Sequence, residues 1–252
     1  MSSPFAVFGP GVVMVTRTDT TTPYAVNVGY SQELSIDLSG TEKLLYGQNQ
    51  YPLVATRGTI KATGKIKAAT LSGMAWNACF FGGSFTAGRD NYYLNESRNV
   101  ATTSVVVTNA AGGIVDLGVT YASTGIPLVR VASAPTVGQY SVAASTGTYT
   151  INVSDENINL LFNYSNFSSA ASGQQLQVTN TALGSNPTFQ LDYWTNLNQP
   201  SATPFAVRLF SCLGTKISLA AKLEDYMMPE IDFSIFATAG GSVMNFNFPQ
   251  IS

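Results

Sequence analysis

Short runs of alternating apolar and polar residues recur along the chain, and clusters of Gly, Asn, Ser and Pro separate them. This period of two is typical of strands that bury one face, so the alternation predicts a mainly β protein. Residues 33–38 form one such run, and its polar face would carry Glu33, Ser35 and Asp37. Residues 59–68 form another, and its polar face would carry Thr59, Lys61, Thr63, Lys65 and Lys67. The apolar faces of both runs are expected to face a core.

The connection between these two runs is too long for a hairpin turn. It covers residues 39–57, and residues 42–46 fit a short helical turn. Long connections within a compact domain are usually functional or mobile. This one carries large apolar residues that no neighbouring segment would cover, namely Leu44, Leu45, Tyr46 and Tyr51. An apolar loop in water is an association site, so residues 39–56 are predicted to contact another molecule.

Only one segment has the spacing of an amphipathic helix, at residues 72–81. Its apolar positions, three and four residues apart, are Leu71, Met74, Ala75, Ala78 and Cys79. Ser72 would cap the first turn, and Gly82 with Gly83 would end the helix in a left-handed conformation. The helix is therefore expected to pack on a sheet and to bury Leu71, Met74, Ala78 and Cys79.

The composition divides the chain into a main domain and an insertion. Residues 109–199 are poorer in charge and richer in Ser, Thr, Asn and Gly than the rest. Strands are expected in this part at 127–131, 139–143, 148–153 and 159–164, the last two as a hairpin. Four more are expected at 205–210, 216–222, 230–236 and 242–248, the last two joined by a Gly-rich turn. The predicted fold is a β-sandwich or partial barrel of residues 1–108 and 200–252, with one flanking α-helix and the insertion 109–199.

Charged residues make up only 10% of the 252 residues, whereas about 25% is usual for a soluble protein. Uncharged polar residues replace them. Charged side chains are depleted in protein–protein interfaces, so this composition favours a protein that works inside an assembly. The chain has no histidine, which excludes Ser-His-Asp and Cys-His relays and His-based zinc sites. Its two cysteines, Cys79 and Cys212, are predicted to be buried free thiols.

The charge pattern offers one basic cluster and one acidic group. The net charge of −2 gives no overall attraction to nucleic acid, but Lys61, Lys65 and Lys67 share a strand face. These lysines could follow a phosphate backbone or, in the preferred interpretation, pair with acidic residues such as Glu33 and Asp37 of the strand at 33–38, within one subunit or between subunits. The acidic group consists of Glu224, Asp225, Glu230 and Asp232. It is interpreted as a strand connection and a strand face rather than as a pair of catalytic carboxylates.

Other chemistry is not indicated. Asp90, Glu96, Asp155 and Glu156 are too scattered for a calcium site and are interpreted as solvated turn residues. The chain is therefore expected to have no catalytic residues, no metal site and no cofactor. The start of the sequence lacks the pattern of a signal peptide, and no stretch is apolar enough to cross a bilayer. A protein made and kept in the cytoplasm, without membrane contact, is expected.

Three parts of the chain resemble structural proteins of bacteriophages. Residues 43–69 (KLLYGQNQYPLVATRGTIKATGKIKAA) are similar to the major tail tube proteins of long-tailed bacteriophages. GQYSV at 138–142, GTYTI at 147–151 and LFNY at 161–164 resemble a strand pair frequent in phage tail and virion proteins. MPEIDFSIFA at 228–237 and GGSV at 240–243 resemble the C-terminal hairpin of the tube protein family.

The resemblance implies a virion protein that forms hexameric rings stacked into a tail tube, whose lumen, completed by oligomerisation, conducts DNA into the host. Its partners would be copies of itself and the tape measure, terminator and distal tail proteins, while double-stranded DNA passes without sequence-specific binding. It would be assembled in the host cytoplasm and reside in the virion tail. The inner sheet at the lumen would carry Glu33, Ser35, Asp37, Thr59, Lys61, Thr63, Lys65 and Lys67. The loop that contacts the next ring would carry Leu44, Leu45, Tyr46 and Tyr51.

Two other functions stay open. A phage head or decoration protein would have the same composition as a tube protein. A carbohydrate-binding β-sandwich would use aromatic side chains as stacking platforms, and the candidates are Tyr92, Tyr93, Tyr193 and Trp194. The basic face at Lys61, Lys65 and Lys67 also departs from the mostly acidic lumens of tail tubes.

Overall fold

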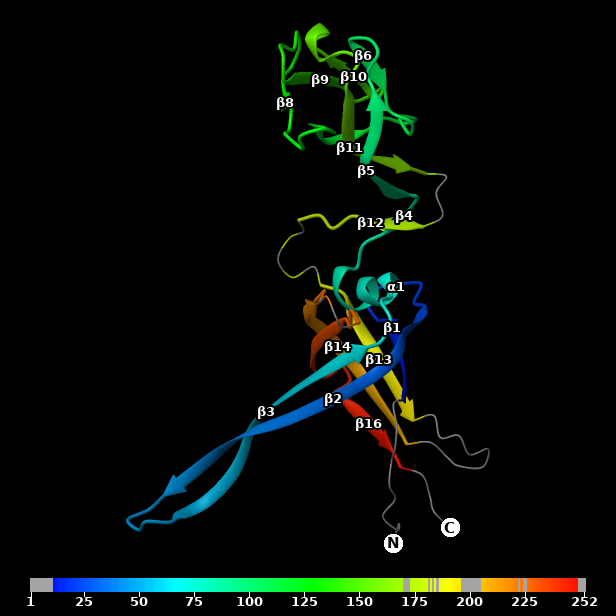
Figure 1. The fold of residues 1–252 in the computed structure, drawn as a ribbon. Helices are drawn as coiled ribbons and strands as arrows, with labels where there is room; N and C mark the ends of the chain where they lie inside the picture. The colour runs from blue at the N-terminus through cyan, green and yellow to red at the C-terminus, as the bar shows by residue number, and fades with distance from the viewer. Residues whose placement is uncertain are drawn as a thin grey trace. The chain divides into compact units, whose positions relative to one another are not determined.

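The computed structural model describes residues 11–169, 173–180, 182, 184, 186–195, 205–221, 223 and 226–248. The fold is mainly β, with antiparallel sheets and one short helix, as the alternation predicted (Figure 1). The chain divides into two compact units. Unit 1 consists of Met1–Gly83 with Val178–Ser252, and unit 2 consists of Ser84–Gln177.

The boundaries of unit 2 differ from those expected for the insertion, 109–199. Strand β5 (Arg89–Asn99) pairs with β11 (Asn159–Ser168) inside unit 2. Strand β13 (Thr188–Thr195) pairs instead with β1 (Gly11–Arg17) of unit 1. The composition changes at residue 109, but strand pairing over long sequence distances decides which unit a segment joins.

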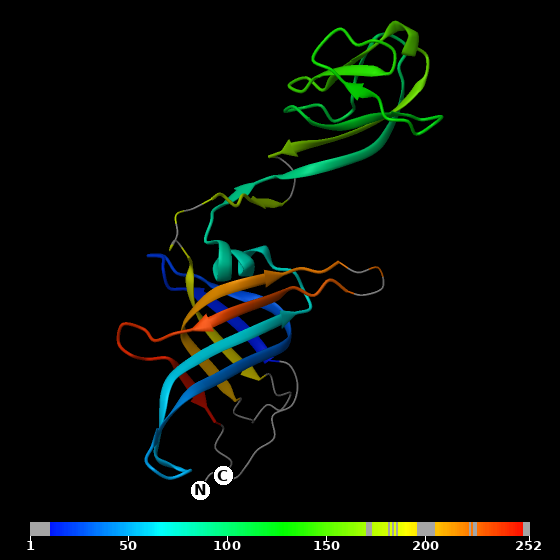
Figure 2. The same cartoon turned by 90° about the vertical axis from the view of Figure 1, so that its left-hand side faces the viewer.

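Unit 1 is built on one sheet whose order is β13-β1-β2-β3-β15-β14-β16. The strands not yet given bounds are β2 (Ala25–Tyr46), β3 (Pro52–Ala68), β14 (Ala206–Ser218), β15 (Glu230–Ile235) and β16 (Met244–Asn247). Strand β13 also pairs with β14, so the pairings pass through six strands and return to their start (Figure 2).

Two expected features of the C-terminal strands are wrong. The strands expected at 205–210 and 216–222 are one continuous strand, β14, whose pairings with β13 and β15 each contain a register shift. The hairpin expected between the last two strands does not form, because β15 and β16 both pair with β14.

The core of unit 1 follows the predicted alternation where the sheet is complete. Gly64, Ile66 and Ala68 of β3 are buried, and their neighbours Lys65 and Lys67 point the other way. Farther along the same faces, Ile60 is 56% exposed and Leu38 is 54% exposed, although both were expected to face the core. Both lie where β2 and β3 extend beyond the neighbouring strands, so no core is present there.

The single helix lies where the sequence predicted it. Helix α1 (Gly73–Trp76) continues into a π-helical segment, η1 (Asn77–Phe81). The Ser72 hydroxyl accepts a hydrogen bond from the Ala75 N–H at 3.2 Å, and Gly82 ends the helix with φ of 66°. These are the cap and the left-handed stop expected from the sequence.

The buried face of the helix differs from the expected one. Ala75, Ala78 and Cys79 are buried, but Leu71 is 54% exposed and Met74 is 38% exposed, so their predicted burial is wrong. Leu71 precedes α1, which begins at Gly73, and Met74 lies in its first turn. The predicted spacing therefore holds for the buried Ala75, Ala78 and Cys79 and fails at the N-terminal end of the segment.

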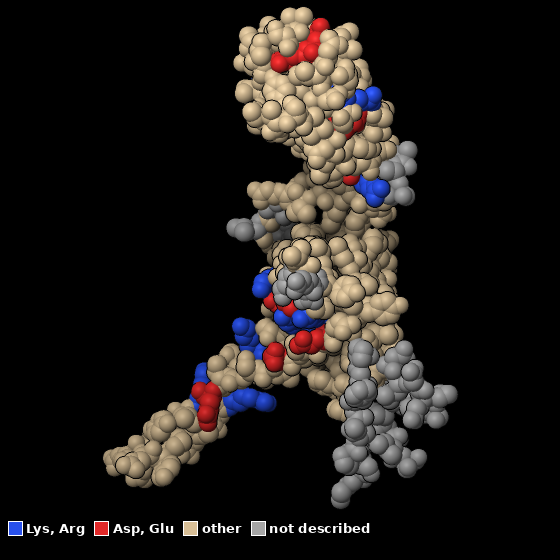
Figure 3. Space-filling view, viewed as in Figure 1, with Lys and Arg blue, Asp and Glu red and all other residues tan. Residues whose placement is uncertain are grey.

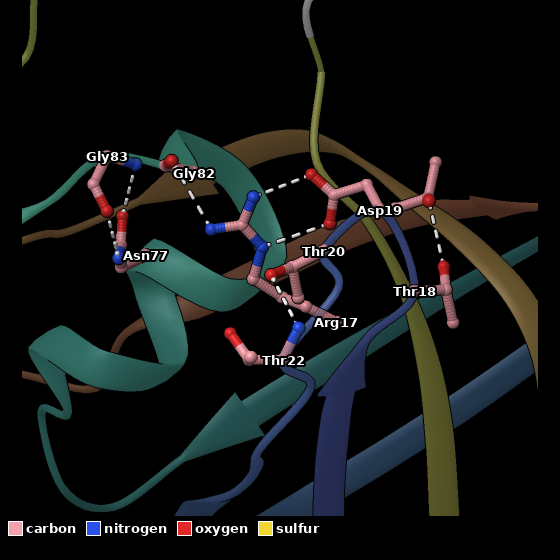
Figure 4. A network of polar contacts seen from close by, with 9 residues as sticks. Arg17, Thr18, Asp19, Thr20, Thr22, Asn77, Gly82 and Gly83 are labelled. Atoms are coloured by element: carbon pink, nitrogen blue, oxygen red, sulfur yellow. Dashed lines mark hydrogen bonds and ion pairs between the residues drawn. The ribbon is translucent and has the colours of Figure 1, made fainter.

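Polar contacts tie the end of the helix to strand β1 (Figure 4). The Arg17 guanidinium donates to Asp19 at 2.6 and 3.0 Å and to the Gly82 carbonyl oxygen at 3.3 Å. The Asn77 side chain donates to the Gly83 carbonyl oxygen at 2.8 Å and accepts from the Gly83 N–H at 2.7 Å. Carbonyl groups that the helix end leaves unpaired thus find partners.

Both thiols are free and buried, as the sequence predicted. Cys79 lies on the helix and Cys212 on β14, and both belong to the core of unit 1. Burial raises the pKa of Cys212 to about 12 and raises that of Cys79 as well, so both thiols stay protonated at neutral pH. Their role in this structure is packing.

Unit 2 contains three small sheets, β5-β11-β7, β6-β10-β9-β8 and β4–β12. Its remaining elements are β4 (Phe85–Ala87), β6 (Ser104–Val106), β7 (Val115–Tyr121), β8 (Val129–Arg130), β9 (Gln139–Ala143), β10 (Thr148–Ile151), the 3-10 turn η2 (Val153–Asp155) and β12 (Gln174–Leu176). Strand β10 pairs with β6 and β9, whereas β11 pairs with β5 and β7. The hairpin expected between the runs at 148–153 and 159–164 is therefore wrong.

Tyrosine hydroxyls donate to carboxylates in the interior of unit 2. Tyr140 and Tyr149 donate to Asp116 at 2.7 and 2.9 Å, and Tyr121 donates to Asp155 at 2.9 Å. Asp155 is only 4% exposed, so its interpretation as a solvated turn residue is wrong. Buried carboxylates need such donors, because an unpaired buried charge is costly.

Glu96 is held by a similar set of donors. Its carboxylate accepts the Tyr164 hydroxyl at 2.5 Å, the Thr108 hydroxyl at 2.6 Å and the Arg98 guanidinium at 2.8 Å. Burial raises the pKa of Glu96, but the hydrogen bonds from Thr108, Tyr164 and Arg98 outweigh it and lower the pKa to about 2. The ionised form therefore stabilises the folded unit.

The helix face gives a first prediction. Ala78→Asp is expected to lower the free energy of unfolding by several kcal/mol, because it places an unpaired charge in a fully buried position. Met74→Asp, at an exposed position of the same helix, is expected to change it by less than about 1 kcal/mol. Chemical denaturation of the two variants measures both values. Equal losses would show that Met74 belongs to the core.

Glu96 gives a second prediction, on pH. Its pKa is lower in the folded chain than the ordinary value of 4.5, so its contribution is complete above pH 4.5 and is lost as the pH falls toward 2. Tyr164→Phe removes one donor, so the loss of stability over this range should be smaller in the variant. Hydrogen exchange of the β11 amides as a function of pH measures it. The same pH dependence in both proteins would contradict the assignment.

Candidate assembly site: the β2–β3 hairpin and its charged face

The connection predicted at 39–56 is not a loop. Strands β2 and β3 stay paired from Ser31 opposite Ala68 to Tyr46 opposite Pro52, so only residues 47–51 form the turn. The helical turn expected at 42–46 is likewise part of β2. Alternation reveals a strand only when one face is buried. Here both faces are exposed, and the pattern is absent although the pairing is regular.

The hairpin extends beyond the sheet as a ribbon of two strands (Figure 1). Strand β15 pairs with β3 only over Ala62–Lys67, and β1 pairs with β2 only between Ala25 and Tyr30. Beyond these positions, neither outer edge of the ribbon has a strand partner among the described residues. Free edges of this length are open to pairing with another chain. A ribbon of two strands is also marginally stable by itself, so a covering partner would stabilise it.

The end of the hairpin is apolar and exposed. We call this region the hairpin tip; its large exposed side chains are Leu44, Leu45, Tyr46, Tyr51, Leu53 and Val54. Tyr51, in the turn, is 80% exposed. The sequence identified the first four and missed Leu53 and Val54, which lie on β3 beside them. Apolar side chains gathered on a projecting ribbon are typical of an association surface.

Charged side chains cover the outer face of the sheet near the base of the hairpin (Figure 3). Strand register places Lys67 between Glu33 of β2 and Glu230 of β15. In the next row of this face, Lys65 lies between Ser35 and Asp232, and Asp232 in turn lies opposite Lys216 of β14. We call this surface the charged face; its members are Glu33, Ser35, Asp37, Lys61, Thr63, Lys65, Lys67, Lys216, Glu230 and Asp232.

Two lysines of the charged face share one carboxylate. The Lys65 Nζ lies 2.7 Å from Glu230 Oε2, and the Lys67 Nζ lies 3.6 Å from Glu230 Oε1. The hydrogen bond between Lys65 and Glu230 raises the pKa of the lysine and lowers that of the glutamate. Within the chain, the described ion pairs of these lysines therefore go to Glu230, on the strand on the other side of β3, and not to Glu33 or Asp37. Pairing between subunits stays a prediction.

The predicted inner-sheet residues occupy two regions. The first lies within the sheet and contains Glu33, Ser35, Asp37, Thr63, Lys65 and Lys67, while Thr59 and Lys61, the latter still on the charged face, lie where the two-stranded ribbon begins. Thr59 is within 3.2 Å of the Thr41 hydroxyl across the hairpin. The sequence did not connect Glu230, Asp232 or Lys216 with this face, because only long-range strand pairing brings them there. Glu224 and Asp225 lie outside the described residues.

The four aromatic candidates for carbohydrate stacking belong to different units. Tyr193 and Trp194 line a groove of about 610 Å³ in unit 1, which also contains the ion pair between Arg208 and Asp192 at 2.5 Å. Tyr92 and Tyr93 lie on β5 in unit 2, where Tyr93 stacks on Tyr164 with ring centroids 5.0 Å apart. Neither unit assembles all four into one platform.

The described part of the chain contains no group of three or more Cys, Asp or Glu side chains that could hold a metal ion. Its helices are too short to span a bilayer. No family model matches the chain, and no curated protein matches it either. Function must therefore be inferred from the hairpin and the charged face.

Proposed function

We propose that the protein is a structural virion protein that forms the tail tube of a bacteriophage, as hexameric rings stacked around a DNA conduit. The observation that carries the proposal is the β2–β3 hairpin, which leaves the sheet, has free edges and ends in an exposed apolar tip. The sequence resemblance to tail tube proteins lies in this same segment, residues 43–69. In the proposal, unit 1 is the β-sandwich or barrel of each subunit, and the hairpins of six subunits complete the tube.

Association within a ring would use the edges of the hairpin. The free edge of β2 and the free edge of β3 lie on opposite sides of the ribbon. If the β3 edge of one subunit pairs with the β2 edge of the next, each subunit offers the same contact to a further copy. Such head-to-tail pairing either closes into a ring or grows as a helix, and closure removes every free edge.

Association between rings would bury the hairpin tip. Removing a large apolar side chain from water contributes roughly 1.5–3 kcal/mol, so Leu44, Leu45, Tyr46 and Tyr51 could together stabilise a contact between rings. The six subunits of a ring would multiply this contribution. The low content of charged residues supports the same conclusion, because such surfaces repel one another little.

The charged face would line the lumen. It carries as many acidic as basic side chains, since Glu33, Asp37, Glu230 and Asp232 balance Lys61, Lys65, Lys67 and Lys216. This balance removes the difficulty of a basic lumen and agrees with passage of DNA without sequence-specific binding. The partners of the tube would be the tape measure, terminator and distal tail proteins, and the proposal assigns the chain no catalytic reaction.

The hairpin tip gives the test. Replacing Leu44, Leu45 and Tyr46 by Ser, Gly and Ser is expected to abolish tubes and to leave a soluble, β-rich subunit, because these side chains are exposed in the subunit. Negative-stain electron microscopy and sedimentation velocity measure assembly, and circular dichroism measures folding. Tubes formed by the variant, or a variant that does not fold, would refute the assignment of the tip.

A matched control removes apolar side chains elsewhere. Val129, Val137 and Val153 of unit 2 are each more than 60% exposed, and their replacement by Ser should leave the tubes intact. Loss of tubes in both triple variants would mean that assembly depends on surface hydrophobicity in general. Closed shells or single discs formed by the parent chain, in place of tubes, would favour a head or decoration protein.

A further inference from the structure

Glu230 occupies a central position on the charged face. It begins β15 and lies opposite Lys67 in the register, while its two carboxylate oxygens contact the two lysines separately, at 2.7 and 3.6 Å. The three side chains are all about one-third exposed, at 37% for Lys65, 31% for Lys67 and 28% for Glu230. They therefore interact at a surface that another molecule can reach.

Without this carboxylate, Lys65 and Lys67 would lose their ion-pair partner and would form a row of cations on β3 with Lys61. Lys61, Lys65 and Lys67 point to the same side of one strand, and residues two apart on a strand are about 7 Å apart. A line of cations on a flat, exposed strand is suited to nucleic-acid phosphates, and each lysine that contacts a phosphate adds affinity by releasing a counterion. A conduit that held DNA in this way would slow its passage.

We infer that Glu230 is the residue that prevents Lys65 and Lys67 of β3 from binding nucleic-acid phosphates. The inference deepens the proposed function, on which its biological meaning rests, by naming the group that keeps the charged face inert toward DNA. The other nearby carboxylates do not replace it. Glu33 lies across from Lys67 and Asp232 across from Lys65, but neither forms an ion pair among the described residues.

The test measures binding of a labelled DNA duplex to the soluble full-length chain, below the concentration at which it assembles. Glu230→Gln keeps the size of the side chain and removes its charge. The variant is expected to bind the duplex about tenfold or more tightly at low salt, with a salt dependence of log Kd steeper by about two, as for two additional phosphate contacts. Unchanged affinity would overturn the inference.

Two controls distinguish the effect of losing the charge at position 230 from the effect of changing the net charge of the chain. Glu156→Gln makes the same change of net charge in unit 2, where Glu156 forms no ion pair among the described residues, and should leave DNA binding unchanged. Adding Lys65→Gln and Lys67→Gln to Glu230→Gln should abolish the gain. Equal gains in the Glu156 and Glu230 variants, or a gain that survives loss of both lysines, would refute the role of Glu230.

Folding and assembly are measured separately. Circular dichroism verifies that the Glu230→Gln variant is folded. If that variant is unstable, the binding measurement is repeated with Glu230→Thr, because threonine has a high strand propensity. Microscopy of the parent chain tests the tube independently. A gain in DNA affinity in a protein that never forms tubes would support the role of Glu230 and refute the conduit. Tubes with no gain in affinity would refute the role of Glu230 alone.

Discussion

Backbone pairing between β2 and β3 is the interaction on which the rest of unit 1 depends. Every strand residue carries a donor and an acceptor that need partners, and β2 is 22 residues long. Pairing with β3 provides hydrogen-bond partners for the backbone groups along one edge of β2, over most of its length. The same register places Lys65 and Lys67 of β3 between β2 and β15, which carry acidic side chains. Because the pairing continues beyond the other strands, the apolar tip lies away from the core. Fold, charged face and tip are thus consequences of one alignment.

Sequence patterns predicted the strands that bury one face and failed where neither face is buried. The runs at 33–38 and 59–68 both lie in strands of the structure, and the core covers one side of them except at Leu38 and Ile60, where the ribbon begins. The residues between them have no core to face, so nothing in their order distinguishes a paired ribbon from a loop. The apolar character of Leu44, Leu45, Tyr46 and Tyr51 was evident from the sequence, but their place on a hairpin was not.

Other errors arose where distant segments decide the outcome. The caps of the helix are local and were predicted, whereas the exposure of Leu71 and Met74 depends on where the helix begins and on the strands against which it packs. The ion pairs of Lys65 and Lys67 could not be assigned either, because Glu230 reaches them only through the pairing of β15 with β3. Asp155 looked like a turn residue until a tyrosine from another strand was placed beside it.

The pairing of β4 with β12 has a consequence for how this chain can change. The main chain leaves unit 1 at Gly83 and returns at Val178, and Phe85 lies opposite Leu176 just inside unit 2. Paired strands are only about 5 Å apart, so the excursion begins and ends at nearly one point. The two ends of unit 2 are thus as close together as the ends of a short surface loop, and insertions are best tolerated at such loops. The closeness of the entry and exit strands is thus the geometry that the insertion of a whole domain requires, and none of the strand pairs of the large sheet in unit 1 includes a strand of unit 2.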